Sequence, residues 1–117
     1  MYTKKISGGY ATLIDGIDIK TLVHGEKTLL AEFLLHAGYI IPRHAHPHEQ
    51  TGYMVSGMAL MTIGHQTYEM QPGDSWSIAG GIAHSVEVLE DSIVIEVFSP
   101  VREDYLPYQI GESENFD

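Results

Sequence analysis

Short apolar runs separated by glycine, proline and aspartate dominate this sequence. Several runs alternate apolar and polar positions with a period of two, which is the pattern of half-buried β-strands, and few stretches show the helical period. We therefore expect an all-β protein of antiparallel strands at residues 10–14, 17–23, 28–36, 51–56, 58–63, 66–70, 75–78, 84–88 and 93–98.

Three glycine-containing sites predict where the chain turns between these strands. Gly64-His65 separates two apolar runs and predicts the turn of a β-hairpin. The run 71–74 (Gln-Pro-Gly-Asp) predicts a second reversal, because proline and glycine supply the required dihedral angles. Gly57 marks a turn or a β-bulge.

The period-two pattern also predicts which polar side chains face the interior. Val86 and Val88 should face the core, so His84 shares that inward face. In the last run Glu96 shares a face with Val94 and Phe98, which places a carboxylate in an apolar setting.

Length and charge restrict the class of protein. A chain of 117 residues predicts one domain, residues 1–117, with an acidic tail at 107–117. Six Lys and Arg against 16 Asp and Glu give a net charge of -10, which argues against nucleic acid or an anionic membrane surface as a partner. With zero cysteines and neither a membrane span nor a signal peptide in the pattern, we expect a cytoplasmic protein.

A histidine cluster at residues 44–50 is the strongest chemical feature. His44 and His46 are two residues apart, so on a strand both imidazoles point to the same face. With zero cysteines in the chain, imidazole is the expected ligand, and it suits one divalent transition ion such as Ni, Zn, Mn, Fe or Cu.

Two spaced patterns resemble the two motifs of the cupin superfamily. The first is Gly38-x5-His44-x-His46-x3-Gln50-x6-Gly57, and the second is Gly73-x5-Ala79-x-Gly81-x2-His84. The resemblance implies a double-stranded β-helix, that is, a jelly-roll barrel of two antiparallel sheets, with its core at about residues 28–100. It also implies one metal ion held inside the barrel by His44, His46, Gln50 and His84.

Two positions depart from the cupin pattern. Gln50 stands where a glutamate is usual, and Ala79 where a proline is usual. A neutral amide leaves the site one charge more positive, which strengthens a bound ion as a Lewis acid but weakens its binding. Glu49 is the alternative ligand if the register of the loop differs.

The remaining histidines and two aromatic residues are not expected to bind the metal ion. We expect His48 to lie beside the site or on the surface, with ligation as the alternative. His24, His36 and His65 are expected to be uninvolved in the site. Tyr53 and Trp76 are expected in the core, with a position in the wall of the substrate site as the alternative.

A closer resemblance is to the KdgF family of pectin-degradation cupins. It rests on the run 46–50 (His-Pro-His-Glu-Gln) and on the run 96–106 (Glu-Val-Phe-Ser-Pro-Val-Arg-Glu-Asp-Tyr-Leu). Members of that family open the ring of 4,5-unsaturated monouronates to give linear keto acids. The resemblance implies a catalytic carboxylate at Glu96, an aromatic wall at Phe98 and a carboxylate-binding arginine at Arg102. The family has aspartate where this chain has Glu96, which displaces the carboxylate by more than about 1 Å.

Other functions remain open. A metal-dependent dioxygenase on the same barrel predicts oxygen consumption, and a non-catalytic metal- or sugar-binding cupin predicts ligand affinity without turnover. Glu96 could instead pair with a neighbouring base, and Arg102 could form a surface ion pair. We expect a small anionic substrate, and the exposed sheet edges and N-terminal arm predict a homodimer.

Overall fold

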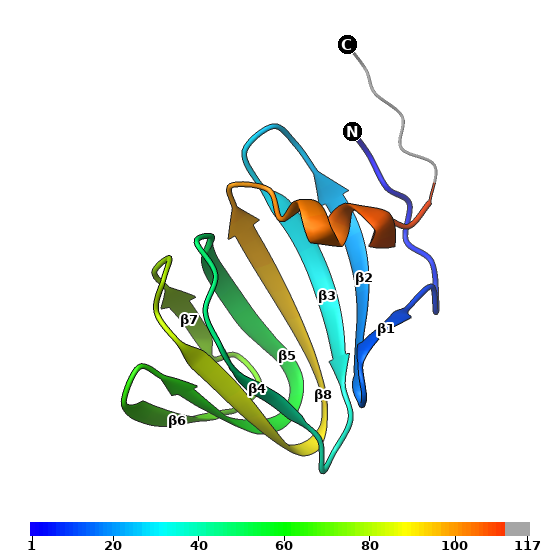
Figure 1. The fold of residues 1–117 in the computed structure, drawn as a ribbon. Helices are drawn as coiled ribbons and strands as arrows, with labels where there is room; N and C mark the ends of the chain where they lie inside the picture. Colours follow the sequence, from blue (N-terminus) through cyan, green and yellow to red (C-terminus); the bar gives the residue numbers. More distant parts are fainter. Residues whose placement is uncertain (112–117) are drawn as a thin grey trace.

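The computed structural model describes residues 1–111, which form eight β-strands and one short 3-10 helix (Figure 1). These elements are β1 (Ala11–Ile14), β2 (Ile17–His24), β3 (Leu29–Leu35), β4 (Ile40–His44), β5 (Glu49–Ile63), β6 (Gln66–Met70), β7 (Ser75–Ile78), β8 (His84–Ser99) and η1 (Glu103–Tyr108). Within the described residues, no helix combines the length and apolar character needed to cross a membrane.

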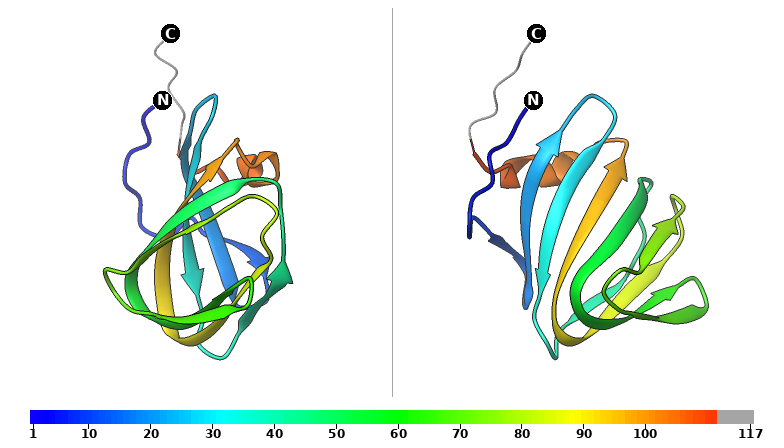
Figure 2. Two further views of the ribbon diagram at one scale, coloured as in Figure 1. Left: turned by 90° about the vertical axis from the view of Figure 1, so that its left-hand side faces the viewer. Right: turned by 180° about the vertical axis from the view of Figure 1, so that it is seen from behind.

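The strands form two antiparallel layers that share β5 and β8. One layer runs in the order β1-β2-β3-β8-β5-β7, and the other is formed by β4, β8, β5 and β6. Each of the two long strands therefore takes part in both layers. Figure 2 shows the second layer curving across the first, so that the strands enclose an interior. The predicted all-β jelly-roll barrel is confirmed, and its layers are joined rather than separate.

A bulge replaces a strand break at Gly57. The predicted strands 51–56 and 58–63 are one strand, β5, whose pairing with β8 shifts between Met54 and Ala59. Gly57 has φ of 98°, and a Cβ there would lie 2.2 Å from Ser92 Oγ. The same hydroxyl accepts a hydrogen bond from the Met58 amide at 3.1 Å, so Ser92 fixes the bulge. Runs 84–88 and 93–98 are likewise one strand, β8.

Alternating side chains fill the barrel interior. Along β3, Leu29, Ala31, Phe33 and Leu35 are buried while the residues between them are partly exposed. On β8 the inward set continues through His84, as predicted from the period of two. Complete burial of one such apolar side chain stabilises the fold by about 1.5–3 kcal/mol.

The chain after β8 turns across one end of the barrel. η1 crosses the ends of β8, β3 and β2 (Figure 1). Tyr105 is buried against Phe33 and Phe98, and the Thr21 hydroxyl donates a 2.7 Å hydrogen bond to its carbonyl oxygen. This docking holds the preceding residue pair, Val101 and Arg102, at the rim of the barrel.

The expected acidic tail is only partly within the described residues. Residues 107 and 108 complete η1, and Ile110 is buried with its amide bonded to the Thr21 carbonyl at 3.0 Å. The rest of the predicted tail, 112–117, lies outside the described residues.

Candidate metal centre and active site

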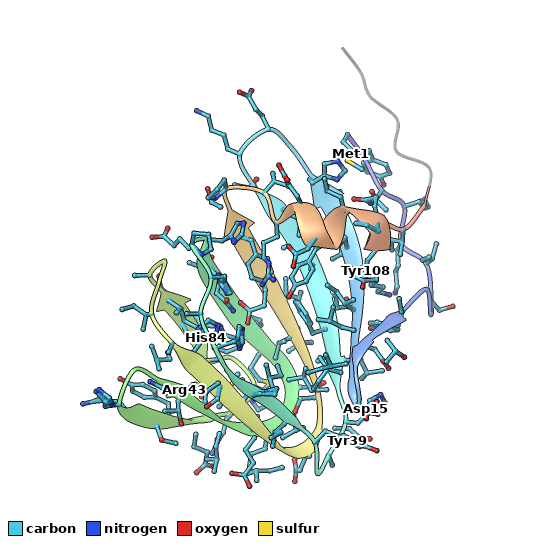
Figure 3. The ribbon with its side chains drawn as sticks, viewed as in Figure 1. Met1, Asp15, Tyr39, Arg43, His84 and Tyr108 are labelled. Carbon is cyan, nitrogen blue, oxygen red and sulfur yellow. The ribbon has the colours of Figure 1, made fainter. Side chains whose placement is uncertain are left out.

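Three histidines from distant parts of the sequence converge inside the barrel. His44 ends β4, and His46 follows it in the connecting loop. His84, labelled in Figure 3, begins β8. Each offers one ligand atom, and these atoms all lie within 4.8 Å of one another. The ring centroids of His44 and His84 are 4.3 Å apart, and those of His46 and His84 are 5.1 Å apart. One ion could reach all three imidazoles.

Backbone carbonyls fix the orientation of these imidazoles. Nδ1 of His44, His46 and His84 lies 2.8, 3.0 and 2.9 Å from the carbonyl oxygens of Pro42, His48 and Ile82, respectively. Each Nδ1–H is thereby assigned as a donor, which leaves the Nε2 lone pair available for an ion. Such outer hydrogen bonds are the usual way in which proteins orient metal-binding histidines.

Burial keeps two of the imidazoles in the neutral form that binds metals. It lowers the pKa of His46, and the positive charge of Arg102 lowers it further. Burial also lowers the pKa of His84, against the opposing effect of its bond to the Ile82 carbonyl. At neutral pH a metal ion therefore has few protons to displace.

The Gln50 side chain lies beside the three histidines. It is buried, and Oε1 lies 2.9 Å from Nε2 of His46. Nδ1 of His46 carries the proton, so the Nε2 lone pair of His46 and a lone pair of Gln50 Oε1 face each other. Two facing lone pairs repel each other unless a cation binds both. Ligands about 2.1 Å from an ion at a right angle are about 3.0 Å apart, so the spacing of these two atoms fits a shared transition metal. Glu49, the alternative ligand, is exposed.

Glu96 is a buried carboxyl group beside this donor set. Trp76 Nε1 donates to Glu96 Oε1 at 3.0 Å and to Oε2 at 3.3 Å, and the Gln50 side chain also hydrogen-bonds to the carboxylate. Burial raises the pKa of Glu96 to about 8, although both hydrogen bonds oppose the shift. The alternative of a neighbouring base as partner does not apply, because its partners are an indole and an amide.

Arg102 lies at the rim of the barrel over two aromatic rings. Its guanidinium carbon is 3.9 Å from the centroid of Tyr105 and 5.2 Å from that of Phe98. Nε and Nη2 donate to Asp104 at 3.2 and 2.7 Å, which lowers the pKa of that carboxyl. The ion pair considered as the alternative role of Arg102 is present, yet only one edge of the guanidinium faces Asp104. The Arg102 side chain is 13% exposed, so the charge is held close to the cavity.

A cavity of about 70 Å³ connects these groups. It is lined by the polar side chains of His44, His84, Gln50, Glu96 and Arg102. Most of the other lining residues are apolar and come from β1, β2, β3, β5 and β8. The volume accommodates several water molecules or a small ligand.

The remaining sequence assignments divide into two groups. His24 bonds to Gln109 and His36 to Asp18, while His65 is exposed, so these histidines are outside the site as predicted. His48 lies beside His46, with ring centroids 5.6 Å apart, and is outside the three-histidine group.

The prediction of a core position was wrong for Tyr53, which is 49% exposed. Trp76 packs against the core as expected and is half-buried. It is also hydrogen-bonded to Glu96, a contact that the sequence did not predict. The signal that could have identified it is Gly52, a glycine within a strand, which often marks a close approach by another group.

Comparison with known proteins supports this assignment of the fold. Residues 31–99 match the family model described as Cupin domain. An uncharacterised protein of Streptomyces coelicolor is 32% identical over 69 residues, which are 58% of this chain and 66% of that protein. The chain thus spans slightly less than two thirds of that relative.

Solved structures give the same result. The structure of KdgF from Halomonas sp. superimposes with a TM-score of 0.80 at 29% identity, covering 83% of this chain and 90% of that one. An RmlC-like cupin from Shewanella frigidimarina also gives 0.80, at 23% identity, covering 91% and 100% of the two chains. Because the family model spans more than half of the sequence and the barrel is that of the neighbours, this chain belongs to the cupin family.

Proposed function

We propose that this cupin is a KdgF-like, metal-dependent enzyme that opens the ring of 4,5-unsaturated monouronates. The observation that carries the proposal is one cavity lined by the histidine pair His44 and His84 together with Gln50, Glu96 and Arg102. Resemblance to the KdgF family, and the 29% identity to a KdgF of known structure, support this choice of substrate class.

Arg102 binds the substrate carboxylate in this proposal. Its free edge offers two parallel N–H donors, which match the two oxygens of a carboxylate. Stacking on Tyr105 fixes the plane of the guanidinium. Asp104 holds the opposite edge, so the orientation of the fork is set before substrate arrives.

Glu96 moves the proton. Ring opening removes a proton from the anomeric hydroxyl, breaks the bond between the anomeric carbon and the ring oxygen, and leaves an enolate. In its ionised form, which Trp76 and Gln50 favour against burial, Glu96 accepts the hydroxyl proton and returns it to the alkene carbon, which yields the linear keto acid. A divalent ion bound by the histidines and Gln50 would supply Lewis-acid stabilisation of the substrate's oxygens.

Phe98 forms the inner wall between the polar groups. It is 2% exposed and packs against Tyr105, with ring centroids 5.3 Å apart. Its ring is also 6.0 Å from that of His46. This packing keeps water from one side of the cavity and sets the distance between Glu96 and Arg102.

The test is direct. Purified protein loaded with metal is incubated with unsaturated galacturonate, and loss of absorbance from the conjugated alkene is followed. We expect loss well above the spontaneous rate, and little above it for His84→Ala. A wild-type rate equal to the spontaneous one, with each of the five candidate metals tried in turn, would exclude this function.

The apolar lining of the cavity favours a second candidate, a dioxygenase. The apolar side chains that line it include those of Leu13, Ile17, Phe33, Met70 and Val94. Such a lining suits an aromatic or diketone substrate better than a sugar acid. This candidate predicts oxygen consumption by the iron- or nickel-loaded protein. An oxygen electrode separates the two reactions, because ring opening consumes no oxygen.

We also propose that the active form is a homodimer. The outer face of the first layer carries exposed apolar side chains. On β5, Tyr53 and Val55 are 49% and 43% exposed, and Tyr53 is the register partner of Ile95 on β8. A second copy of the chain would cover this face. Light scattering after size exclusion should give twice the monomer mass, and the monomer mass for Tyr53→Glu combined with Val55→Glu.

A further inference from the structure

Trp76, Gly52 and Glu96 form one row across three neighbouring strands. Gly52 on β5 is the register partner of Trp76 on β7 and of Glu96 on β8. All three positions are on the inner face, because buried residues lie two positions away on each strand, at Ile78, Met54 and Phe98. The hydrogen bond from the indole to the carboxylate therefore crosses the strand that separates them.

The absence of a side chain at Gly52 makes this crossing possible. A Cβ at residue 52 would lie 2.2 Å from Trp76 Nε1 and 2.4 Å from Glu96 Oε2. Both distances are far shorter than any real contact, so even alanine would separate the indole from the carboxylate. Gly52 has no positive φ, and steric room is therefore the reason for glycine at this position.

The carboxylate is held from two sides by groups with different roles. Gln50 contacts it from the side of the histidines, and Trp76 from the side of β7. Without the indole, the three side-chain torsions of a glutamate would allow several carboxylate positions.

We propose that Trp76 is a positioning residue for Glu96, and that Gly52 is the permissive residue through which it acts. This inference rests on the proposed function, in which Glu96 transfers the proton. The indole restricts the longer glutamate to a single carboxylate position, where the KdgF family has the shorter aspartate. Trp76 itself does not contact the reacting atoms.

The first test observes the contact without any reaction. Trp76 is the one tryptophan of the sequence, so the ¹⁵N-labelled, metal-loaded protein gives one indole N–H signal. We expect this signal downfield, as for a hydrogen-bonded indole, with an upfield shift in Gly52→Ala and in Glu96→Asp, whose carboxylate cannot reach. Gly25→Ala, which meets no atom within 4 Å, and Glu87→Gln on the exposed face of β8 are the controls.

An indole signal that stays in place in Glu96→Asp overturns the proposal. That variant shortens a side chain without filling space, so the result does not depend on whether Gly52→Ala folds. A signal that moves equally in the two controls would overturn it as well.

The second test is a kinetic double-mutant cycle. Trp76→Phe keeps an aromatic ring and removes the donor, and we expect kcat to fall by about 10- to 100-fold with KM within about twofold. In a Glu96→Gln background the same substitution should change the residual rate very little, because the effect acts through the carboxylate. An equal loss in both backgrounds would show a merely structural role and overturn the proposal.

The two hypotheses fail differently. Absence of turnover by the wild-type protein would exclude the proposed function and the reaction assigned to Glu96. The indole spectrum would then still decide whether Trp76 holds the carboxylate.

Discussion

His44 and His84 are direct register partners across β4 and β8, with their ring centroids 4.3 Å apart. β4 is a short strand that pairs with β8, and its pairing shifts between Ile41 and His44. The shift allows His44 to face His84 at the end of the strand pair. When β4 pairs with β8, His44 and His84 are brought together as well. An ion bound by both would therefore couple metal binding to folding.

Metal removal should destabilise the protein. A ligand that binds only the folded state at 100 times its dissociation constant stabilises it by about 2.7 kcal/mol. We expect chelator treatment to lower the melting temperature, and readdition of the metal to restore it. Differential scanning calorimetry of both forms checks this, and equal melting temperatures would contradict the coupling.

Loss of one imidazole should abolish tight metal binding. His84→Ala removes a donor from the buried side of the site, and we expect the dissociation constant to rise by at least about 100-fold. Calorimetric titration and elemental analysis measure the effect. His65→Ala, in the exposed turn between β5 and β6, is the matched control and should bind one ion as the wild type does. Unchanged binding by His84→Ala would exclude this donor set.

The stability of the metal-free protein should fall as pH rises through the titration of Glu96. Its folded-state pKa is about 8, raised from 4.5, so the folded state holds a proton that the unfolded state releases above about pH 4.5. Stability from this group is fully present below that pH and is lost as pH rises through 8. The full shift corresponds to on the order of 5 kcal/mol.

Glu96→Gln should remove this pH dependence. The variant cannot ionise, so its stability relative to the wild type should be greater at pH 9 than at pH 5. Urea unfolding at both values, in chelator-treated protein, provides the comparison. Glu87→Gln on the same strand is exposed and should follow the wild type. Parallel curves for wild type and Glu96→Gln would show that the carboxyl is not buried as described.

Arg102→Lys should weaken substrate binding more than it weakens the fold. Lysine keeps the charge but lacks the planar fork and the stacking on Tyr105, so we expect KM to rise by about tenfold. Asp104→Asn removes the charge of the exposed partner but keeps an oxygen that accepts from the guanidinium. It should therefore change KM by no more than about twofold. Steady-state kinetics of both variants decide the point. If Arg102→Lys and Asp104→Asn raised KM equally, Arg102 would act only through its ion pair with Asp104 and would not bind the substrate.

The inward positions were predictable from alternation, whereas the contacts between strands were not. The period of two placed His84 and Glu96 inside correctly, because each belongs to a regular run of buried neighbours. Trp76 lies on a strand of four residues, too short for a period to distinguish core from site. Its partner Glu96 is 20 residues away, and the register that brings them together depends on pairing with β5. The bulge at Gly57 was recognisable as a glycine, but only Ser92 on another strand decides that it is not a turn.

The final prediction concerns a buried lysine on the outer face of the first layer. Lys20 on β2 is 6% exposed and pairs with Glu32 on β3, with Nζ 3.5 Å from the carboxylate. Nζ also donates to the carbonyl oxygens of Ile6 and Gly8 at 3.3 and 3.1 Å. Tyr10 bonds to the same carboxylate through its hydroxyl, so one ion pair ties the N-terminal arm to the sheet.

Lys20→Met should release this arm. Methionine retains the apolar stem but loses every Nζ contact and leaves Glu32 without its cation, at a cost of about 1–3 kcal/mol. We expect the free energy of unfolding to fall by that amount, and amide exchange to accelerate mainly at residues 6–10. Lys27→Met, in the exposed turn between β2 and β3, should change neither. Since the arm lies far from the histidines in the chain and on the opposite face of the sheet, metal affinity should be unaltered. Exchange that accelerates across the whole barrel instead would show that Lys20 supports the sheet rather than the arm.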